Sequence, residues 1–319
     1  MSTAGCQTGG SVPIGVLQPI VNLSIGIDLG GTNIKVALVD TQSAKILATL
    51  SKPTRDGEFE GDTPRFALKV REIVHEFEAQ AGQKLSVGLS APGLANPNGQ
   101  CIDWMPGRMH GLEKFAWADF LGRDCRVLND AHAALLGEVW AGAAKDCRDV
   151  FMLTLGTGVG GAIWSGGRLL KGHIGRAGHL GHTTIDSNAP CDDFNTPGSL
   201  EDAIGNQTIA QRGEGRYATT LALLDAYGAD DEHAKKVWLT SVRHLAAAIA
   251  SLINVLDPEV VILGGGIAIG AKDRLFIPLQ QALDGFEWRP GGNQARLVPA
   301  LLGDSAGCLG SVFNLLQNS

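Results

Sequence analysis

The sequence lacks the features that define several protein classes. Its six cysteines are scattered and include no Cys-x-x-Cys pair, which argues against a disulfide framework or a cysteine-based metal site. No apolar run approaches the ~18 residues that span a membrane. The first basic residue is Lys35, so the N-terminus has no positively charged region of a secretory signal peptide. We therefore expect a cytoplasmic protein with reduced thiols.

Positive charge is also scarce, because the formal net charge is −7, which argues against a nucleic-acid partner. The 319 residues are enough for two domains of common size. Glycine is abundant, with 43 residues against a usual share of about 7%, and this excess indicates turns and ligand loops. Residues 1–22 are small, polar and interrupted by Gly and Pro, so we expect a flexible leader, too short for a DNA-binding domain.

Two glycine-rich turns lie about half a chain apart. The first runs from Asp28 to Lys35 and the second from Leu155 to Gly161, and both have strand-like runs on either side. A P-loop or a dinucleotide fingerprint would lead into a helix, so neither fits. Glycine lets backbone N–H groups approach phosphate oxygens. Each turn alone could be an ordinary hairpin, but Thr32 and Thr157 at similar places favour a two-part phosphate site.

The predicted helices and strands follow the same order in each half of the chain. The first half has an amphipathic helix over Pro64–Ala81, a buried strand over Leu85–Leu89, and a short strand before a helix that begins near Asn129-Asp130. The second half has a hairpin over Val150–Trp164, helices near 201–213 and 231–256, and an apolar strand that ends in three glycines. This pattern predicts a duplicated α/β unit with a cleft between its halves.

From residue 23 onward, the chain resembles the ROK sugar kinases of the actin/hexokinase-like ATPase superfamily. The resemblance is carried by the order and spacing of these segments: Asp28–Lys35, Ala91–Gly93, Asn129-Asp130, Leu155–Gly161, Gly178–His182, Leu200-Glu201, Gly264–Gly266 and Gly303–Gly307. It implies an α/β fold of two duplicated actin-like ATPase domains, related to ribonuclease H, around an interdomain cleft. Residues 23–128 with 304–319 would form the N-terminal lobe, and residues 129–303 the C-terminal lobe.

The resemblance also implies an ATP-dependent kinase that uses Mg²⁺ and phosphorylates a hydroxyl of a hexose or of an amino- or acylamino-hexose. Phosphoryl transfer depends mostly on positioning and charge neutralisation. Asp130 would be the general base that accepts the hydroxyl proton. Asn129-Asp130 is also a good helix N-terminus, so capping is an alternative role, and the two roles are compatible.

The family pattern assigns further residues to the two ligands. Residues implied to bind the nucleotide are Asp28, Gly30, Gly31, Thr32, Lys35, Gly156, Thr157, Gly158, Gly160, Gly264, Gly265 and Gly266. Residues implied to contact the sugar are Gly93, Asn129, Asp130, His179, His182 and Glu201. Asp28 would lie near Mg²⁺, or else be a strand-end turn residue. Lys35 could instead face solvent, and His182 could be a hydrogen-bonded core histidine.

Two departures from the family pattern stand out. Relatives usually read Ala-Gly-Glu-x-Gly-His, whereas His179 replaces the sugar-contacting carboxylate here. A carboxylate only accepts hydrogen bonds, but a neutral imidazole donates and accepts, so hydroxyl preference should change. The segment around Arg108, where many relatives present an Asn to the sugar, also differs. Relatives often hold a structural Zn²⁺ with a cysteine cluster that this chain reduces to Cys191, so we expect no structural zinc.

Three other functions remain open from the residues. A sugar-responsive regulator would carry a DNA-binding domain, for which we expect no room before residue 23. An actin-like assembling ATPase would not need the hydroxyl-binding set around Asn129 and Glu201. A sugar-binding pseudokinase stays possible because of His179. The sugar, the hydroxyl phosphorylated, and the choice of ATP or polyphosphate as donor are undetermined, and a homodimer is expected from the family alone.

Overall fold

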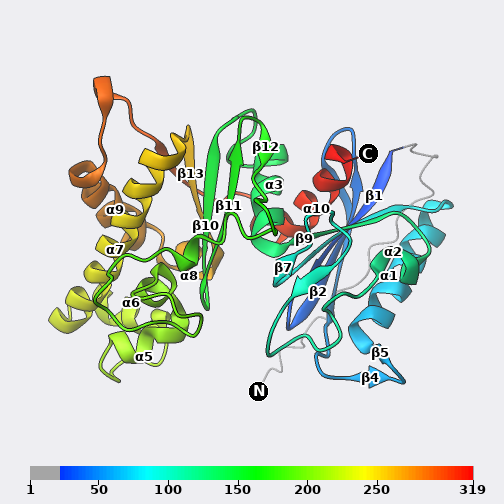
Figure 1. The fold of residues 1–319 in the computed structure, drawn as a ribbon, viewed down its shortest axis with the longest axis horizontal. Coiled ribbons are helices and arrows are strands. Elements are labelled where there is room, and N and C mark those ends of the chain that lie inside the picture. The colour runs from blue at the N-terminus through cyan, green and yellow to red at the C-terminus, as the bar shows by residue number, and fades with distance from the viewer. Residues whose placement is uncertain (1–21, 319) are drawn as a thin grey trace, which may run out of the picture.

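The computed structural model describes residues 22–318 and shows two lobes, each built around a five-stranded sheet (Figure 1). The strand order is β3-β2-β1-β6-β9 in the N-terminal lobe and β12-β11-β10-β13-β14 in the C-terminal lobe. In each sheet three strands form an antiparallel meander, and two more continue the sheet in parallel from the meander's first strand. This topology confirms the predicted duplication. The expected leader lies outside the described residues, apart from Asn22.

The N-terminal lobe follows the first half of the chain. Its main strands are β1 (Leu23–Leu29), β2 (Asn33–Asp40), β3 (Lys45–Pro53), β6 (Ser86–Ala91) and β9 (Cys125–Asn129). Its short strands and helices are β4 (Phe59–Glu60), β5 (Thr63–Pro64), α1 (Arg65–Ala81), β7 (Leu94–Ala95), β8 (Ile102–Trp104) and α2 (Trp117–Leu121).

The C-terminal lobe contains the longest helix of the described chain. Its strands are β10 (Val150–Leu155), β11 (Val159–Ser165), β12 (Arg168–Leu169), β13 (Val260–Gly264) and β14 (Arg296–Pro299). Its α-helices are α4 (Leu200–Ile204), α5 (Ile209–Arg212), α6 (Thr220–Gly228), α7 (Glu232–Leu256), α8 (Gly265–Ala271) and α9 (Asp273–Phe286). Its short 3-10 turns are η1 (Leu180–His182), η2 (Asn206–Thr208) and η3 (Pro290–Gly292).

Two predicted helices are confirmed. In α1 every apolar position of the predicted face is buried, and the helix ends at Gly82 in the left-handed conformation. Helix α7 is capped at its N-terminus by Asp231, whose side chain accepts a hydrogen bond from the Ala234 amide at 2.7 Å. Among residues 22–318, α7 is the one helix long and apolar enough to cross a membrane. It packs against α4, α6 and α9, which is the environment of a core helix.

The predicted helical region 201–213 is broken into α4, η2 and α5. The break has a physical cause. The Asn206 and Gln207 amides donate to the carbonyls of Gly156 and Thr157, each at 2.9 Å, so they are not available to continue a helix. The backbone amides at the break in the helix thus hold the second glycine turn in place.

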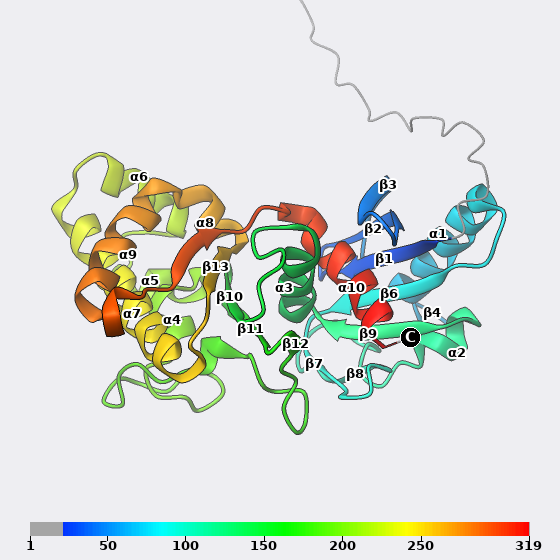
Figure 2. The same ribbon diagram turned by 90° about the horizontal axis from the view of Figure 1, so that it is seen from above.

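Helices α3 (Asp130–Ala141) and α10 (Ala306–Gln317) lie between the two sheets (Figure 2). The 3-10 turn η4 (Gly303–Ser305) leads into α10, which returns the end of the chain to the N-terminal sheet. Because α3 contacts strands of both sheets, it couples the lobes. The proposed lobe boundaries at 128/129 and 303/304 remain predictions.

Glycines permit a close crossing of α3 and α10. A Cβ atom on Gly310 would lie 1.7 Å from the carbonyl oxygen of Ala133, and one on Gly137 would lie 2.4 Å from that of Ala306. No side chain fits at such distances. The two helices therefore approach backbone to backbone, and this contact fixes where α3 begins.

We predict that Gly310→Ala destabilises the protein by at least about 1–3 kcal/mol, because the added methyl group overpacks the crossing. Gly285→Ala in α9 is the matched control, since a Cβ atom added there would meet nothing within 4 Å, and it should be neutral or stabilising by up to about 1 kcal/mol. Urea unfolding measures both. Equal effects of the two substitutions would contradict the close crossing.

Candidate active site

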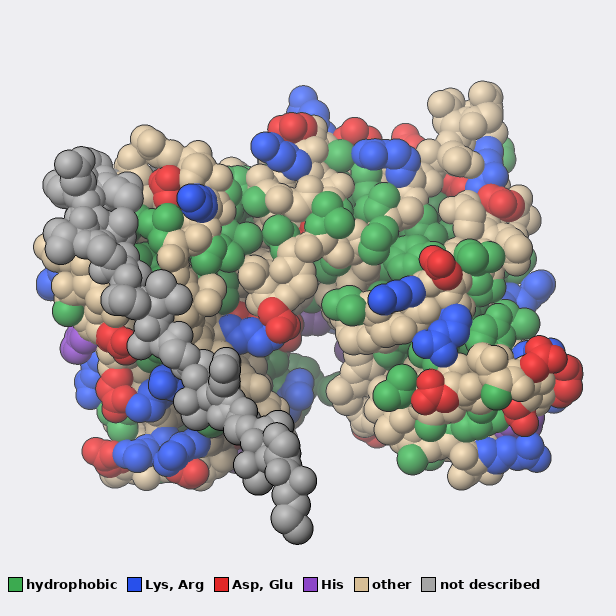
Figure 3. Space-filling model, turned by 180° about the vertical axis from the view of Figure 1, so that it is seen from behind, with side chains coloured by type: hydrophobic (Ala, Val, Ile, Leu, Met, Phe, Trp, Pro, Cys, Tyr) green, Lys and Arg blue, Asp and Glu red, His purple; other side chains and the backbone are tan. Residues whose placement is uncertain are grey.

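Three parallel strands of the N-terminal sheet end side by side. In register, Asp28 of β1 lies beside Ser90 of β6, and Ala91 lies beside Asn129 of β9. Ligands of open α/β sheets bind outside the carboxyl ends of such strands. Figure 3 shows the molecule hollowed between its lobes, with histidine side chains visible in the hollow. The strand ends and the hollow together define the candidate site.

The first glycine turn joins β1 to β2 and is held by the residue after β3. The Gly30 amide donates to the Asn33 carbonyl at 3.0 Å. Thr54 donates its amide to the Thr32 carbonyl at 2.9 Å and its hydroxyl to the Gly30 carbonyl at 2.6 Å. Gly31 and Thr32 remain exposed, which leaves the turn open to a ligand.

The second glycine turn joins β10 to β11 in the same way. The Gly156 amide donates to the Gly158 carbonyl at 2.9 Å, and the amides of Asn206 and Gln207 hold the turn from the side of η2. Thr157 is exposed at its tip. Both predicted turns are therefore strand-to-strand connections with accessible tips, as a two-part phosphate site requires.

Glu201 of α4 lies under the second turn. Its carboxylate oxygen Oε2 accepts a hydrogen bond from the Val159 amide at 2.8 Å. A Cβ atom on Gly158 would lie 2.1 Å from the same oxygen, so the glycine makes room for the carboxylate. Glu201 thereby links α4 to the second turn, and its predicted contact with the sugar remains a prediction.

The three glycines after β13 lie next to the second turn. Gly265 has a φ of +84°, and a Cβ atom there would lie 2.4 Å from the Leu155 carbonyl oxygen. Only glycine avoids both the strain and the overlap. The start of α8 thus packs directly on the strand that leads into the second turn, on the side predicted to hold the nucleotide.

Asp28 is a half-buried carboxylate at the end of β1. The Ser90 hydroxyl donates to its Oδ1 at 3.0 Å, and Gly307 of α10 packs against its carboxyl carbon. Burial raises the pKa of Asp28, and the charge of Asp304 adds to this, while Ser90 and Lys35 act in the opposite direction. Such a carboxylate gains from a nearby cation, which fits its predicted place beside Mg²⁺.

Lys35 of β2 pairs with Asp304 of η4 at 2.6 Å between Nζ and Oδ1. The Asp304 side chain is 89% exposed, and exposed ion pairs contribute little to stability. The ammonium group is therefore held only weakly. Both predicted roles of Lys35, phosphate contact and solvent-facing strand residue, stay open.

Asn129 and Asp130 divide two roles between them. Asn129 is the N-cap of α3, since its Oδ1 accepts from the amides of Ala131 at 2.9 Å and His132 at 3.2 Å. Its Nδ2 donates to the Gly93 carbonyl at 2.9 Å. Asp130 is the first helical residue. Because Asn129 caps the helix, the Asp130 carboxylate is not needed for that purpose.

Asp130 as a whole residue keeps contact with solvent, but protein atoms surround its carboxyl group closely. Burial of the carboxyl group and the negative charge of Asp28 raise the pKa of Asp130 to about 6, and the Ala131 amide and Arg108 partly offset the increase. A carboxylate with a pKa close to the working pH can accept and release a proton.

Two imidazoles with lowered pKa values, those of His132 in α3 and His179, lie next to each other. His132 Nε2 donates to the Ala177 carbonyl at 2.9 Å, and burial lowers the pKa of His132 to about 4. The ring of His179 lies 5.9 Å from that of His132, and burial also lowers the pKa of His179. The Nε2 atom of His179 is covered and has no hydrogen-bond partner within residues 22–318. Its hydrogen-bonding capacity is therefore unused in this structure.

His182 of η1 is oriented by the loop that precedes α4. Its Nδ1 lies 3.5 Å from Oδ2 of Asp192, and its ring packs edge to face on Phe194 at 5.0 Å. Asp192 is itself fixed, because it accepts the amides of Phe194 and Thr196 at 2.9 Å each. A carboxylate therefore lies beside the histidine that a metal is implied to hold in relatives.

The residues around His182 do not fit that implied zinc. Within the described part of the chain, no group of three or more His, Cys, Asp or Glu side chains is placed to hold a metal. Cys191 is exposed, and one thiol and one carboxylate do not complete a tetrahedral site. The lack of a structural zinc remains a prediction.

Sequence reasoning missed an aromatic contact between the lobes. Trp104 of β8 and Phe194 meet at 5.9 Å between ring centroids, although each is about half exposed. It also missed Ser90, which orients Asp28. No local pattern marks these residues, because their roles depend on partners 62 and 90 positions away in the sequence.

Comparison with known proteins identifies the family of the chain. The model of the ROK family matches residues 24–318. A glucokinase of Halalkalibacterium halodurans is 31% identical over 92% of this chain and 94% of its own length. The crystal structure of a ROK hexokinase from Thermus thermophilus has a TM-score of 0.82 and 30% identity, and the match covers 93% of this chain and 100% of that one.

A ROK family glucokinase from Streptomyces griseus, solved in complex with glucose and AMPPNP, has a TM-score of 0.71 and 25% identity over 93% of this chain and 100% of its own. The family match and these likenesses cover nearly all the residues that the structure describes. The chain belongs to the ROK family and has the actin-like ATPase fold of its sugar kinases.

Proposed function

We propose that the protein transfers a phosphoryl group from ATP to a hydroxyl of a hexose or of an amino- or acylamino-hexose, with Asp130 as general base. The observation that carries the proposal is the Asp130 carboxyl group. It stands at the start of α3 at the edge of the cleft, where Asn129 provides the N-cap and Asp130 Oδ1 accepts the Ala131 amide at 2.8 Å, and its pKa is raised to about 6. The two open glycine turns supply backbone donors for the phosphates of the nucleotide.

The charge of the phosphates needs neutralising, and the chain supplies few cations for this purpose. Asp28 would hold Mg²⁺, because its half-buried carboxylate is at the strand end next to the first turn and has a raised pKa. When bound, Mg²⁺ neutralises phosphate charge. Lys35 can add a positive charge at the same turn if it leaves Asp304.

The sugar would bind on the other side of Asp130. Asn129 keeps one amide proton free, since Nδ2 has two and donates one to Gly93. His179 offers its unpartnered Nε2. His182 and Glu201 complete the polar set, and one oxygen of Glu201 remains beyond its bond to Val159. These groups can exchange paired hydrogen bonds with adjacent hydroxyls.

A sugar-binding regulator or pseudokinase of the same family is the second candidate. His179 favours it, because a neutral imidazole stands where relatives place a carboxylate. ATP is the proposed donor, with polyphosphate as the alternative. By likeness to the family, we expect a homodimer that acts in the cytoplasm on a small sugar, without a nucleic-acid or membrane partner.

We predict that Asp130→Asn lowers sugar-dependent ADP formation by about 10²–10⁴-fold, the usual contribution of a general base. Asp124→Asn, at the opposite end of β9, is the matched control and should keep full activity. The assay supplies Mg-ATP with a panel of hexoses, N-acetylhexosamines and other polyols. Turnover that survives in Asp130→Asn would exclude Asp130 as the base, and wild-type inactivity with every sugar would favour the regulator.

The pH dependence of kcat/KM should show a rising limb with a midpoint near 6. Asp130 must be ionised to accept a proton, so activity is lost as the pH falls below its raised pKa of about 6. An unshifted carboxylate would lose activity only near pH 4. Initial rates at low sugar concentration between pH 4.5 and 8 distinguish the two, and a flat profile over this range would contradict the assignment.

We predict that His179→Glu changes the ratio of kcat/KM between sugars by about tenfold or more, because it replaces a group that donates and accepts with one that only accepts. The KM for ATP should not change. His173→Glu adds the same charge on an exposed residue of the same lobe and serves as the control. An unchanged sugar preference and pH profile would remove His179 from the sugar pocket.

A further inference from the structure

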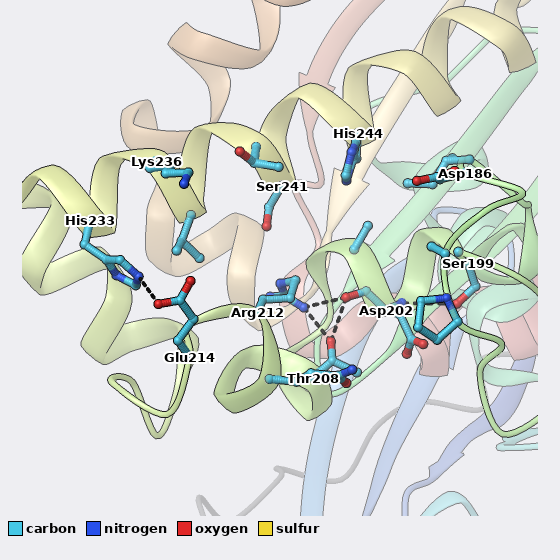
Figure 4. Close-up of a pocket in the computed structure, with 18 residues that line it drawn as sticks. Asp186, Ser199, Asp202, Thr208, Arg212, Glu214, His233, Lys236, Ser241 and His244 are labelled. Atoms are coloured by element: carbon cyan, nitrogen blue, oxygen red, sulfur yellow. Dashed lines mark hydrogen bonds and ion pairs between the residues drawn. The ribbon is translucent and has the colours of Figure 1, made fainter.

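A second cavity lies in the C-terminal lobe, outside the candidate active site. Its volume is about 400 Å³, it is open to solvent, and it is lined by the loop before α4, by α4 and α5, and by one face of α7 (Figure 4). Ile185, Pro190, Ala203 and Val237 give it apolar walls. The cavity can therefore take a small organic molecule as well as an ion.

Arg212 lies among the side chains that line this cavity (Figure 4). Its Nη1 donates to the carbonyls of Asp202 and Gly205, each at 2.8 Å, and to the Thr208 hydroxyl at 2.5 Å. Its Nε and Nη2 atoms are covered and have no hydrogen-bond partner among the described residues. Within residues 22–318, no carboxylate oxygen lies within 4 Å of the guanidinium group.

The unpartnered atoms form one edge of the guanidinium group. Nε–H and Nη2–H point in the same direction, and this fork matches two oxygens of a phosphate or carboxylate group. A buried cation with no carboxylate in direct contact is costly. Burial lowers the pKa of Arg212 to about 10, and the charge of nearby Asp202 partly opposes this. The fork is covered in this structure, so an anion would have to displace the covering side chains, and its binding would then offset that cost.

The other ionisable side chains around the cavity are of both signs, and burial lowers the pKa of His244. Lys236, His233 and His244 of α7 face it. Of the three acids in the lining, Glu214 lies 3.5 Å from His233. The other two are Asp186, which is exposed, and Asp202, whose pKa is raised by burial and by nearby carboxylates. The fixed positive charges in the lining thus belong to Arg212 and Lys236.

The cavity is connected to the second glycine turn through few hydrogen bonds. Arg212 holds the Gly205 carbonyl, and the next two residues along the chain hold the turn itself through their amides. On α4, Asp202 lines the cavity while its neighbour Glu201 holds the Val159 amide. A ligand on Arg212 would fix the segment that positions the nucleotide turn.

We propose that this cavity is an effector site for a small phosphate-bearing molecule, which Arg212 binds through Nε and Nη2 and which tightens nucleotide binding at the second glycine turn. Ordering of the α4–η2 segment by the first ligand lowers the ordering cost for the second. The binding claim stands independently of the proposed sugar kinase activity. The coupling claim rests on the second turn as the nucleotide site.

The binding test uses titration calorimetry on the full chain saturated with Mg-AMPPNP, so that the glycine turns are occupied. The probes are inorganic phosphate, glycerol 3-phosphate as an organic phosphate, and acetate as a carboxylate. We expect one phosphate site per chain, weakened tenfold or more by Arg212→Lys, which keeps the charge and loses the fork. Tighter binding of glycerol 3-phosphate would assign the site to an organic phosphate, and tighter binding of inorganic phosphate to the free ion.

Two further variants control for folding and for charge. Lys236→Glu reverses an exposed charge at the cavity and should also weaken phosphate binding by about tenfold. Arg274→Lys changes an arginine that holds a carbonyl of α6 at 2.8 Å and does not line the cavity, so phosphate binding should be unchanged. Absence of phosphate binding, preference for acetate, or equal binding in wild type, Arg212→Lys and Lys236→Glu would overturn the site.

The coupling test measures AMPPNP affinity with and without saturating glycerol 3-phosphate. We expect affinity to rise about fivefold or more in wild type, and in Lys236→Glu we expect the same rise to need about tenfold more glycerol 3-phosphate. An unchanged affinity despite bound phosphate would overturn the regulatory role. If sugar phosphorylation fails while both ligands bind, the fault lies with the proposed function and not with the effector site.

Discussion

The backbone-to-backbone contact of α3 and α10 is the constraint on which the site depends. The glycines of these helices and of the adjoining strands keep side chains out of the contact. A Cβ atom on Gly26 of β1 would lie 2.1 Å from the Cys308 carbonyl oxygen, and one on Gly88 of β6 would lie 2.2 Å from that of Ser311. The last helix of the chain is thus pressed onto the strands that carry Asp28 and Ser90, and it holds the start of α3 beside them.

This arrangement brings two carboxylates together at one sheet edge. The charge of Asp28 raises the cost of ionising Asp130, and burial raises that cost for both groups. Such a site stores unfavourable electrostatic energy that a cation and a proton donor can relieve. In the proposed kinase these would be the metal and the sugar hydroxyl. The unfavourable interaction between the two carboxylates would thus favour binding of the metal and uptake of the hydroxyl proton.

The sequence predicted those parts of the structure that local patterns specify. The apolar period of α1, the hairpin that contains the second turn and the start of α3 at Asn129-Asp130 follow from side-chain spacing and capping rules, and the structure confirms them. The break between α4 and α5 did not follow, because it depends on hydrogen bonds from η2 to a turn some 50 residues earlier. Local propensity does not reflect hydrogen bonds to residues so far away in the sequence.

In the candidate site too, local patterns predicted some features, whereas others depend on contacts between distant residues. Motif spacing indicated the two turns and Asp130, but not the role of Glu201 beneath the second turn, which rests on the absence of a side chain at Gly158. Nor did it indicate Arg212, which is an ordinary helical residue in the sequence. Arg212 stands out only in the structure, because its Nε and Nη2 atoms are buried and have no hydrogen-bond partner among the described residues. The contact between Asp192 and His182 forms only when the loop is folded. The sequence of that loop showed the loss of the cysteines but did not indicate this contact.

The central claim is that Asp130 accepts the proton of the sugar hydroxyl. A crystal structure of the protein with its preferred sugar and AMPPNP tests this most directly. We expect one sugar hydroxyl within about 3 Å of an Asp130 carboxylate oxygen, on the side that faces the terminal phosphate. A bound sugar whose hydroxyl nearest that phosphate contacts another side chain, with Asp130 turned away, would contradict the account.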